Sequence, residues 1–284
     1  MWASGLFDVA ESAFRDARAL APKDARALNG LARALSGRGH QPEALEHALA
    51  AVGLDSRDPE FHRTVGSIYK HLGRYDLASE SLVRFINLLP VGARDERQWL
   101  ARAELRFLSS FGRRQPHEIL GNQNQVHSLP FRVQHDQVLV SGRMNGSPDM
   151  DFVVDTGSEM AVITQPVAER LGVQPVTYTI SAGVGNVGLR GLQLGRTDRL
   201  ECGTLRLRNV PTIIKNPPLT GMPRQEAESF SPLAFGLSMS IDYQRQVLTI
   251  ARRLPEEDRA DVRLPLWLNR LATLSTNASI VPCP

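Results

Sequence analysis

A repeat with a period of 34 residues restricts the fold of this chain more than any other feature, and it occupies the first third of the sequence. Alanine recurs at this spacing at Ala10, Ala44 and Ala78. Two other residue types keep the same period, with glycines at Gly5, Gly39 and Gly73 and leucines at Leu20, Leu54 and Leu88. Small residues let two helices pack closely, and glycine permits the turn between them. The period therefore predicts a stack of paired α-helices.

This segment resembles the tetratricopeptide repeat, and a helical hairpin array outside that family is the alternative. The unit 59–92 carries residues typical of the family, here Gly66, Tyr69, Gly73, Tyr75, Ala78 and Pro90. The unit 25–58 keeps Leu31, Ala32, Gly39, Ala44 and Ala51. The resemblance covers residues 1–110, from the second helix of an incomplete unit at about 6–20 to a capping helix at 94–110. It implies an array that binds a protein partner on its concave face and carries out no chemistry.

The pattern changes after residue 110. Residues 111–128 are polar and contain glycine and proline, which predicts a linker. In 129–252 short apolar runs such as Phe152–Val154 alternate with turn residues such as Asn145-Gly146, which predicts strands and hairpins. Further strands are expected at 160–164, 176–181, 189–194, 198–207, 210–214 and 239–251, with one short helix at 166–171. The expected fold class is thus multidomain α + β, an N-terminal helical array followed by an all-β unit, either a small barrel or a sandwich.

The sharpest motif is Phe152–Ser158, an apolar strand that runs into Asp-Thr-Gly-Ser. In an ordinary strand end, Asp155 would do no more than cap a turn. The order of the segments that follow favours a functional site instead: a strand at 161–164, a short helix at 165–171 and a glycine-rich hairpin at 180–191. With the closing hairpin at 240–250, this order resembles the single-lobe, retropepsin-like aspartic proteases, over about residues 129–252.

The resemblance implies a role for each residue of the motif. Asp155 is the catalytic carboxylate, and Thr156, Gly157 and Ser158 form the active-site loop. In this scheme Thr156 hydrogen-bonds across a two-fold axis, Gly157 allows the tight turn, and Ser158 orients the carboxylate. The hairpin corresponds to the flap over the substrate, with Gly183, Val184 and Gly185 as flap and substrate-binding residues.

One segment departs from the family pattern. Single-lobe relatives carry an apolar-apolar-Gly segment that packs beneath the catalytic loop, whereas this chain has Phe230-Ser231-Pro232. Either Ser231 replaces the glycine, or Gly236 serves after a shortened connection. This departure supports an alternative function, a non-catalytic interaction scaffold whose protease lobe is degenerate.

Hydrolysis of a peptide by carboxylates requires two of them around one water, and the pair shares a proton at acid pH. Asp155 is the one aspartate that is followed by Thr-Gly. The second carboxylate is therefore expected from Asp155 of another copy, in a symmetric homodimer. The sequence predicts an aspartic endopeptidase that acts on a peptide or protein substrate, which the helical repeats help to recruit.

Other function classes are disfavoured. The basic residues are scattered and the net charge is +3, so no nucleic-acid partner is expected. No apolar run is long enough for a membrane span. Two cysteines and scattered histidines give no metal site, and no nucleotide or cofactor motif is present, so we expect no cofactor. The N-terminus lacks a secretory signal, which predicts a cytoplasmic protein, or a periplasmic one if the true start is missing. The abundance of arginine over lysine is typical of a GC-rich bacterial genome.

The tail, 253–284, begins with a charged linker. Arg263–Leu268 then echoes the Leu-Pro pattern of Ser128–Val133 at the entry to the protease-like segment. Two interpretations remain open: the start of a truncated second lobe, or a strand or helix that docks on the rest of the chain.

Overall fold

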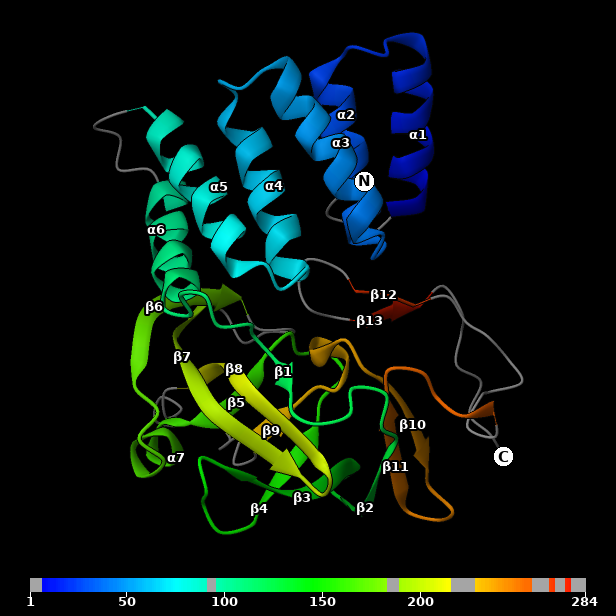
Figure 1. Ribbon diagram of the computed structural model, residues 1–284, viewed down its shortest axis with the longest axis vertical. Helices are drawn as coiled ribbons and strands as arrows, with labels where there is room; N and C mark the ends of the chain where they lie inside the picture. The colour runs from blue at the N-terminus through cyan, green and yellow to red at the C-terminus, as the bar shows by residue number, and fades with distance from the viewer. Residues whose placement is uncertain are drawn as a thin grey trace. The chain divides into compact units, whose positions relative to one another are not determined.

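The computed structural model describes residues 7–90, 96–182, 189–215, 228–256, 266–268 and 274–276 (Figure 1). The chain divides into two compact units, one formed by Met1–Arg113 with Arg263–Pro284 and the other by Arg114–Val262. The first unit carries the N-terminal helices and the second is rich in strands, so the predicted α + β layout is confirmed.

The helices of the first unit lie within the expected ranges. They are α1 (Phe7–Leu20), α2 (Ala25–Gly37), α3 (Gln41–Leu54), α4 (Pro59–His71), α5 (Tyr75–Leu88) and α6 (Glu96–Ser109). Asp24 caps α2 by accepting hydrogen bonds from the backbone N–H of Arg26 and Ala27, and Asp58 caps α4 in the same way. An aspartate at this point satisfies N–H groups that have no partner within the helix. The two caps are one repeat apart.

The small residues of the repeat lie where paired helices meet. Ala44 and Ala78 are fully buried. A Cβ atom built on Gly66 of α4 would lie 3.3 Å from Cβ of Ser81 and 3.4 Å from the carbonyl oxygen of Ala78, both on α5, so the two helices approach closely at this point. Gly39 and Gly73 turn the chain after α2 and α4 with φ of 84° and 70°, which glycine adopts without strain. The 34-residue period thus has a packing origin.

Helix α6 packs on the preceding pair, as expected for a cap. The Lys70 ammonium donates to Glu104 over 2.9 Å and lowers the pKa of that carboxyl. The rings of Tyr75, Phe107 and Phe111 meet edge to face or tilted, with centroids 4.9–6.4 Å apart. These contacts bury the apolar side of α6 and close the stack.

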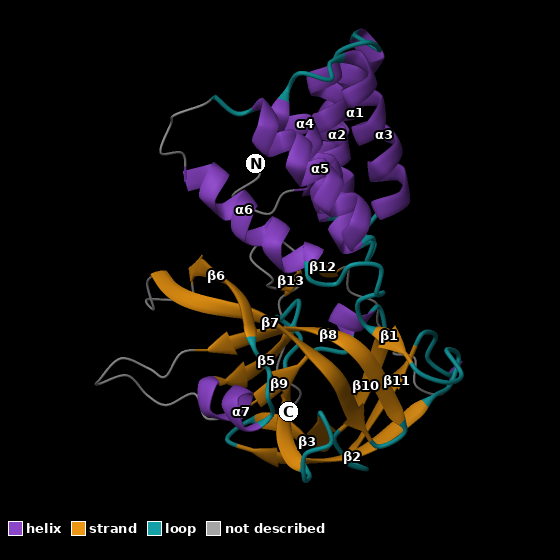
Figure 2. Ribbon diagram, turned by 60° about the vertical axis from the view of Figure 1, so that its left-hand side comes forward, coloured by secondary structure: helices purple, strands orange, loops and turns teal. Residues whose placement is uncertain are grey.

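The second unit is built on one large sheet (Figure 2). Its strands are β1 (Glu118–Ile119), β2 (His127–Gln134), β3 (Gln137–Met144), β4 (Met150–Val154), β5 (Ala161–Thr164), β6 (Pro175–Ala182), β7 (Leu189–Cys202), β8 (Leu205–Lys215), β9 (Glu228–Phe230), β10 (Ser238–Asp242) and β11 (Val247–Ala251). The order is β10-β11-β2-β3-β4-β9-β5-β8-β7-β6, and β3 also pairs with β7. Because of that extra pairing, β3, β4, β9, β5, β8 and β7 form a closed circuit of strands, and many residues of the hydrophobic core come from them. Helix α7 (Gln165–Arg170) packs beside β5.

Three expectations need correction. The strand predicted at 198–207 is wrong, because β7 runs on to Cys202 and the chain turns at Gly203-Thr204 into β8. The single strand expected at 239–251 is wrong, because the run forms two strands, β10 and β11, joined by a turn; the closing hairpin expected at 240–250 is confirmed. Part of 111–128 is not a free linker, because β1 pairs with Arg208 and Leu207 of β8 and the backbone N–H of His117 donates to Asn209.

The tail contains one described hairpin. Its strands, β12 (Leu266–Leu268) and β13 (Leu274–Thr276), pair antiparallel with each other and group with the helical unit. This pairing agrees with a strand at the Leu-Pro echo, and the two interpretations of the tail remain predictions.

Candidate active site

The Asp-Thr-Gly-Ser motif follows a strand in the interior of the sheet. Strand β4 pairs antiparallel with β3 on one side and parallel with β9 on the other. The ladder continues one step past the end of β4, where the backbone N–H of Asp155 donates to the carbonyl of Phe230 over 3.0 Å. The backbone of the half-buried Asp155 is therefore held by β9.

The turn after Asp155 orients its carboxylate. The backbone N–H of Gly157 donates to Asp155 Oδ1 over 2.9 Å, which closes a tight turn. Among the described residues, no hydrogen bond reaches the other oxygen, Oδ2. The Ser158 hydroxyl donates to the carbonyl of Met160 over 2.7 Å, so it stabilises the exit of the loop rather than the carboxylate. This differs from the role expected for Ser158.

The strand register resolves the question of the glycine beneath the loop. Val154 pairs with Phe230 and Asp155 N–H bonds to Phe230, so the residue opposite Asp155 is Ser231. Ser231 is completely buried. Gly236 instead ends the short 3-10 helix η1 (Leu233–Phe235) in the left-handed region with φ of 69°, and it is exposed. Ser231 thus stands where the resemblance expects glycine.

A stack of aromatic rings supports this floor. Phe230 lies parallel to Phe235 with centroids 5.9 Å apart, and it meets Phe152 of β4 edge to face at 6.0 Å. The ring of His117 packs on the ring of Phe235, with centroids 5.0 Å apart. Sequence reasoning missed His117, because it lies in a polar stretch with no periodic pattern. Its Nε2 is buried and, within the described part of the chain, has no hydrogen-bond partner.

The predicted flap corresponds to the hairpin β6–β7. Its arms pair from Pro175 and Gly195 up to Ala182 and Leu189. Gly183, Val184 and Gly185 lie outside the described residues. Strand β6 ends the order of the sheet, and its exposed Tyr178 is an apolar side chain at this edge. Such an edge can pair with an extended peptide.

The other aspartates in the described part of the strand-rich unit lie elsewhere. Four aspartates are paired with arginines at the surface: Asp149 with Arg143, Asp151 with Arg132, Asp198 with Arg196 and Asp242 with Arg245. Asp136 is exposed in the turn between β2 and β3. The buried Glu228 accepts from the Thr164 hydroxyl over 2.8 Å. It pairs with Phe152, three residues before Asp155, or about 10 Å along the strand, which is too far to share a proton.

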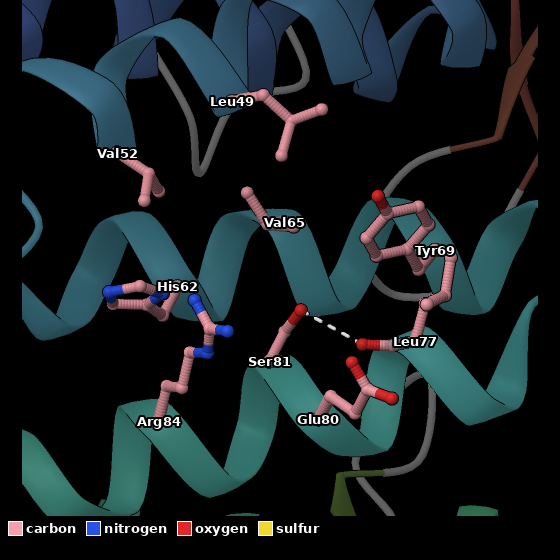
Figure 3. Close-up of a pocket in the computed structure, with 9 residues that line it drawn as sticks. All are labelled: Leu49, Val52, His62, Val65, Tyr69, Leu77, Glu80, Ser81 and Arg84. Atoms are coloured by element: carbon pink, nitrogen blue, oxygen red, sulfur yellow. Dashed lines mark hydrogen bonds between the residues drawn. The ribbon is translucent and has the colours of Figure 1, made fainter.

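The helical unit contains a cavity of about 150 Å³ between α3, α4 and α5 (Figure 3). Its lining residues are Leu49, Val52, His62, Val65, Tyr69, Leu77, Glu80, Ser81 and Arg84. The Ser81 hydroxyl donates to the Leu77 carbonyl over 2.9 Å. The charged groups beside the cavity, the Glu80 carboxylate and the Arg84 guanidinium, come from α5. A mostly apolar hollow of this size, with charged groups beside it, can receive one aliphatic side chain of another protein.

The described residues offer neither a metal site nor a membrane-spanning helix. Among the described residues, no group of three histidine, cysteine, aspartate or glutamate side chains could hold a metal ion. None of the helices in the described ranges is long and apolar enough to cross a membrane.

Comparison with known proteins agrees with this geometry. Residues 140–227 match the family model "Aspartyl protease", so the expected resemblance is confirmed for the segment that contains Asp155. The search of curated proteins gave no match.

Among solved structures, the type III secretion translocator chaperone SycD of Yersinia enterocolitica is 18% identical and covers 38% of this chain and 76% of its own, with a TM-score of 0.36. PcrH in complex with the chaperone binding region of PopD is 23% identical and covers 38% and 83%, with a TM-score of 0.36. A retropepsin-like aspartic protease from Rickettsia conorii is 16% identical and covers 45% and 92%, with a TM-score of 0.34. All three TM-scores are below 0.5.

The buried His117 predicts a loss of stability at acid pH. Burial lowers the pKa of His117 from 6.5 to about 4, so the ring stays neutral in the folded unit while it takes up a proton in the unfolded chain. The stability that the neutral His117 ring contributes to the folded unit is therefore present above about pH 6.5 and is lost as the pH falls toward 4. We expect this group to lower the free energy of unfolding by about 1–3 kcal/mol between neutral and acid pH.

Denaturant unfolding of the natural chain and of His117→Phe, at neutral pH and near pH 4.5, measures this effect. The variant keeps a ring on Phe235 but cannot titrate, so it should lose less stability. His135→Asn, at an exposed turn, is the control and should follow the natural chain. Equal losses in all three proteins would contradict the prediction.

Proposed function

We propose that this protein is an aspartic endopeptidase in which Asp155 residues of two copies act on one water molecule. The observation that carries the proposal is the position of Asp155: its backbone is held by β9, Oδ1 is fixed by Gly157 N–H, and Oδ2 has no hydrogen bond among the described residues. A fixed carboxylate with one oxygen available is what an attacking water requires. The family match over 140–227 supports the same chemistry.

The second carboxylate comes from another copy in this proposal. The aspartates paired with arginines and the distant Glu228 are poor candidates within the chain. Two copies related by a two-fold axis bring one Asp155 loop each to the axis. Thr156, for which the described residues provide no side-chain hydrogen bond, would then find its partner across that axis.

The reaction proceeds in two proton-transfer steps. The ionised carboxylate removes a proton from water, whose oxygen attacks the peptide carbonyl carbon, while the protonated carboxyl donates its proton to the carbonyl oxygen. The tetrahedral intermediate then collapses: the C–N bond breaks, the nitrogen receives the proton held by the first carboxylate, and one hydroxyl of the intermediate returns its proton to the second carboxylate as the new carboxyl group forms. The residues of the flap, Gly183, Val184 and Gly185, would bind the substrate backbone.

The helical repeats recruit a protein partner or substrate. The cavity between α3, α4 and α5 supports this role, because it offers apolar walls to one side chain and a carboxylate and a guanidinium to its neighbours. The exposed Leu49 on its α3 wall is available to such a partner.

A non-catalytic scaffold is the second candidate, and Ser231 is the observation that favours it. A buried side chain now fills the place where the family has glycine, and its hydroxyl has no partner among the described residues. Catalysis that depends on Asp155 separates the two functions.

Asp155→Asn should reduce cleavage of a short peptide by at least about 100-fold, because the amide cannot act as the base. The melting temperature should change little, since Asn can keep the hydrogen bond from Gly157. Peptide cleavage at acid pH and thermal unfolding are the measurements. Asp151→Asn on the same strand, an exposed aspartate, is the control and should retain activity. Equal activity of the Asp155→Asn protein and the natural chain would refute the endopeptidase proposal.

Mixing the natural chain with an equal amount of Asp155→Asn tests the two-copy site. If random dimers form and both carboxylates are needed, about one quarter of the dimers contain two natural chains and are active. The mixture then has about half the activity that the same amount of natural chain shows alone. If the enzyme were monomeric, the mixture would keep the full activity of its natural chain. Specific activity should also fall on dilution as dimers dissociate. Activity that ignores both the mixing and the dilution would indicate a second acid within one chain.

Leu49→Asp tests recruitment by the repeats. A charge on the wall of the cavity should slow cleavage of a protein substrate about fivefold and leave cleavage of a short peptide unchanged. The control is Val83→Asp, which is similarly exposed (42% against 45%) but does not line the cavity. An equal effect of both variants, or none from Leu49→Asp, would argue against this surface.

A further inference from the structure

The side chains of Ser231 and Asp155 lie on the same face of the sheet. Val154 pairs with Phe230, and the hydrogen bond from Asp155 N–H to Phe230 extends the parallel ladder by one residue. The next pair in register is Asp155 with Ser231. Residues paired across neighbouring strands point to the same face, and the strands are about 5 Å apart. The hydroxyl and the carboxylate are therefore neighbours, although no hydrogen bond joins them in the structure.

The Ser231 hydroxyl is an unusual group for this position. The residue is completely buried, and Oγ has no hydrogen-bond partner within the described part of the chain. A buried hydroxyl without a partner destabilises a fold, so a nearby acceptor would be used when it becomes available. Glycine would avoid this cost but would supply no donor.

The carboxylate has a place for such a donor. Oδ1 of Asp155 accepts from Gly157 N–H, and Oδ2 accepts nothing from the described residues. The other hydroxyl near the loop, that of Ser158, is directed to the carbonyl of Met160. Of these two hydroxyls, only that of Ser231 is without a partner.

We propose that Ser231 is a positioning residue whose hydroxyl turns toward Asp155 of the same chain and donates a hydrogen bond to the ionised carboxylate. This inference rests on the proposed function. A donor to the charged form favours that form, so it extends the acid side of the activity range to lower pH. In this view Ser231 replaces the glycine of the family with a group that takes over the orientation of the carboxylate.

The test compares Ser231→Ala and Ser231→Gly with the natural chain, in peptide cleavage from about pH 3 to pH 7. Both variants should lower kcat about tenfold, leave KM nearly unchanged and move the acid limb of the pH profile upward. Ser229→Ala is the matched control, because Ser229 is also buried on β9 and faces the same side two residues earlier. It should leave the pH profile unchanged.

Two outcomes would overturn the inference. One is a Ser231→Gly protein as active as the natural chain with the same acid limb. The other is an equal shift in Ser229→Ala, which would mean that any loss of packing on β9 moves the profile. Thermal unfolding of each variant identifies effects that come from loss of the fold.

A readout without catalysis keeps this inference separate from the proposed function. In protein labelled with carbon-13 at aspartate carboxyls, the Asp155 signal is assigned by its loss in Asp155→Asn and followed with pH. A titration midpoint that rises in Ser231→Ala supports the hydrogen bond even if no peptide is cleaved. A midpoint that stays the same overturns it even in an active enzyme.

Discussion

The hydrogen bond from Asp155 N–H to the Phe230 carbonyl joins two segments that are distant in sequence, and the whole site depends on it. Strands β4 and β9 run parallel, and a parallel pair cannot be closed by a tight turn. The chain between them forms β5, α7, the β6–β7 hairpin and β8 before it returns. The turn at Asp155, the floor at Ser231 and the arms of the β6–β7 hairpin therefore all belong to one crossover. A change that weakens β9 disturbs all of them together.

The helical unit could be predicted closely from the sequence because its contacts are local. Each helix packs on the next one along the chain, and each pair repeats the last, so the 34-residue period carries both the positions of the helices and their contacts. Ala44, Ala78 and Gly66 are small because the helices meet at these points. The capping aspartates Asp24 and Asp58 follow the same period.

The strand-rich unit was predicted less well because its pairings are distant. The length of β7 depends on its pairing with β8 and β3, so a local pattern placed a strand across the real turn at Gly203. Strand β1 is two residues long and exists because β8 offers it a partner. The Asp-Thr-Gly-Ser motif was enough to predict the turn at Asp155, because residues of the motif itself form that turn. The partners of that turn, Phe230 and Ser231, follow from a register that no local pattern determines.

In the proposed aspartic endopeptidase, the chemistry and the stability of the strand-rich unit make opposite demands at acid pH. Two carboxylates that share a proton need a pH low enough to keep one of them protonated. The floor of the site needs His117 neutral, because its ring packs on Phe235, which stacks on Phe230. An exposed histidine would become charged near pH 6.5, before the pair reached its working range. Burial lowers the pKa of His117 in the folded unit to about 4, so its ring stays uncharged at mildly acid pH, while the stability that it contributes declines as the pH falls from 6.5 toward 4. The burial of His117 against Phe235 thus keeps an uncharged ring on the aromatic floor at a mildly acid pH at which an exposed histidine would be charged.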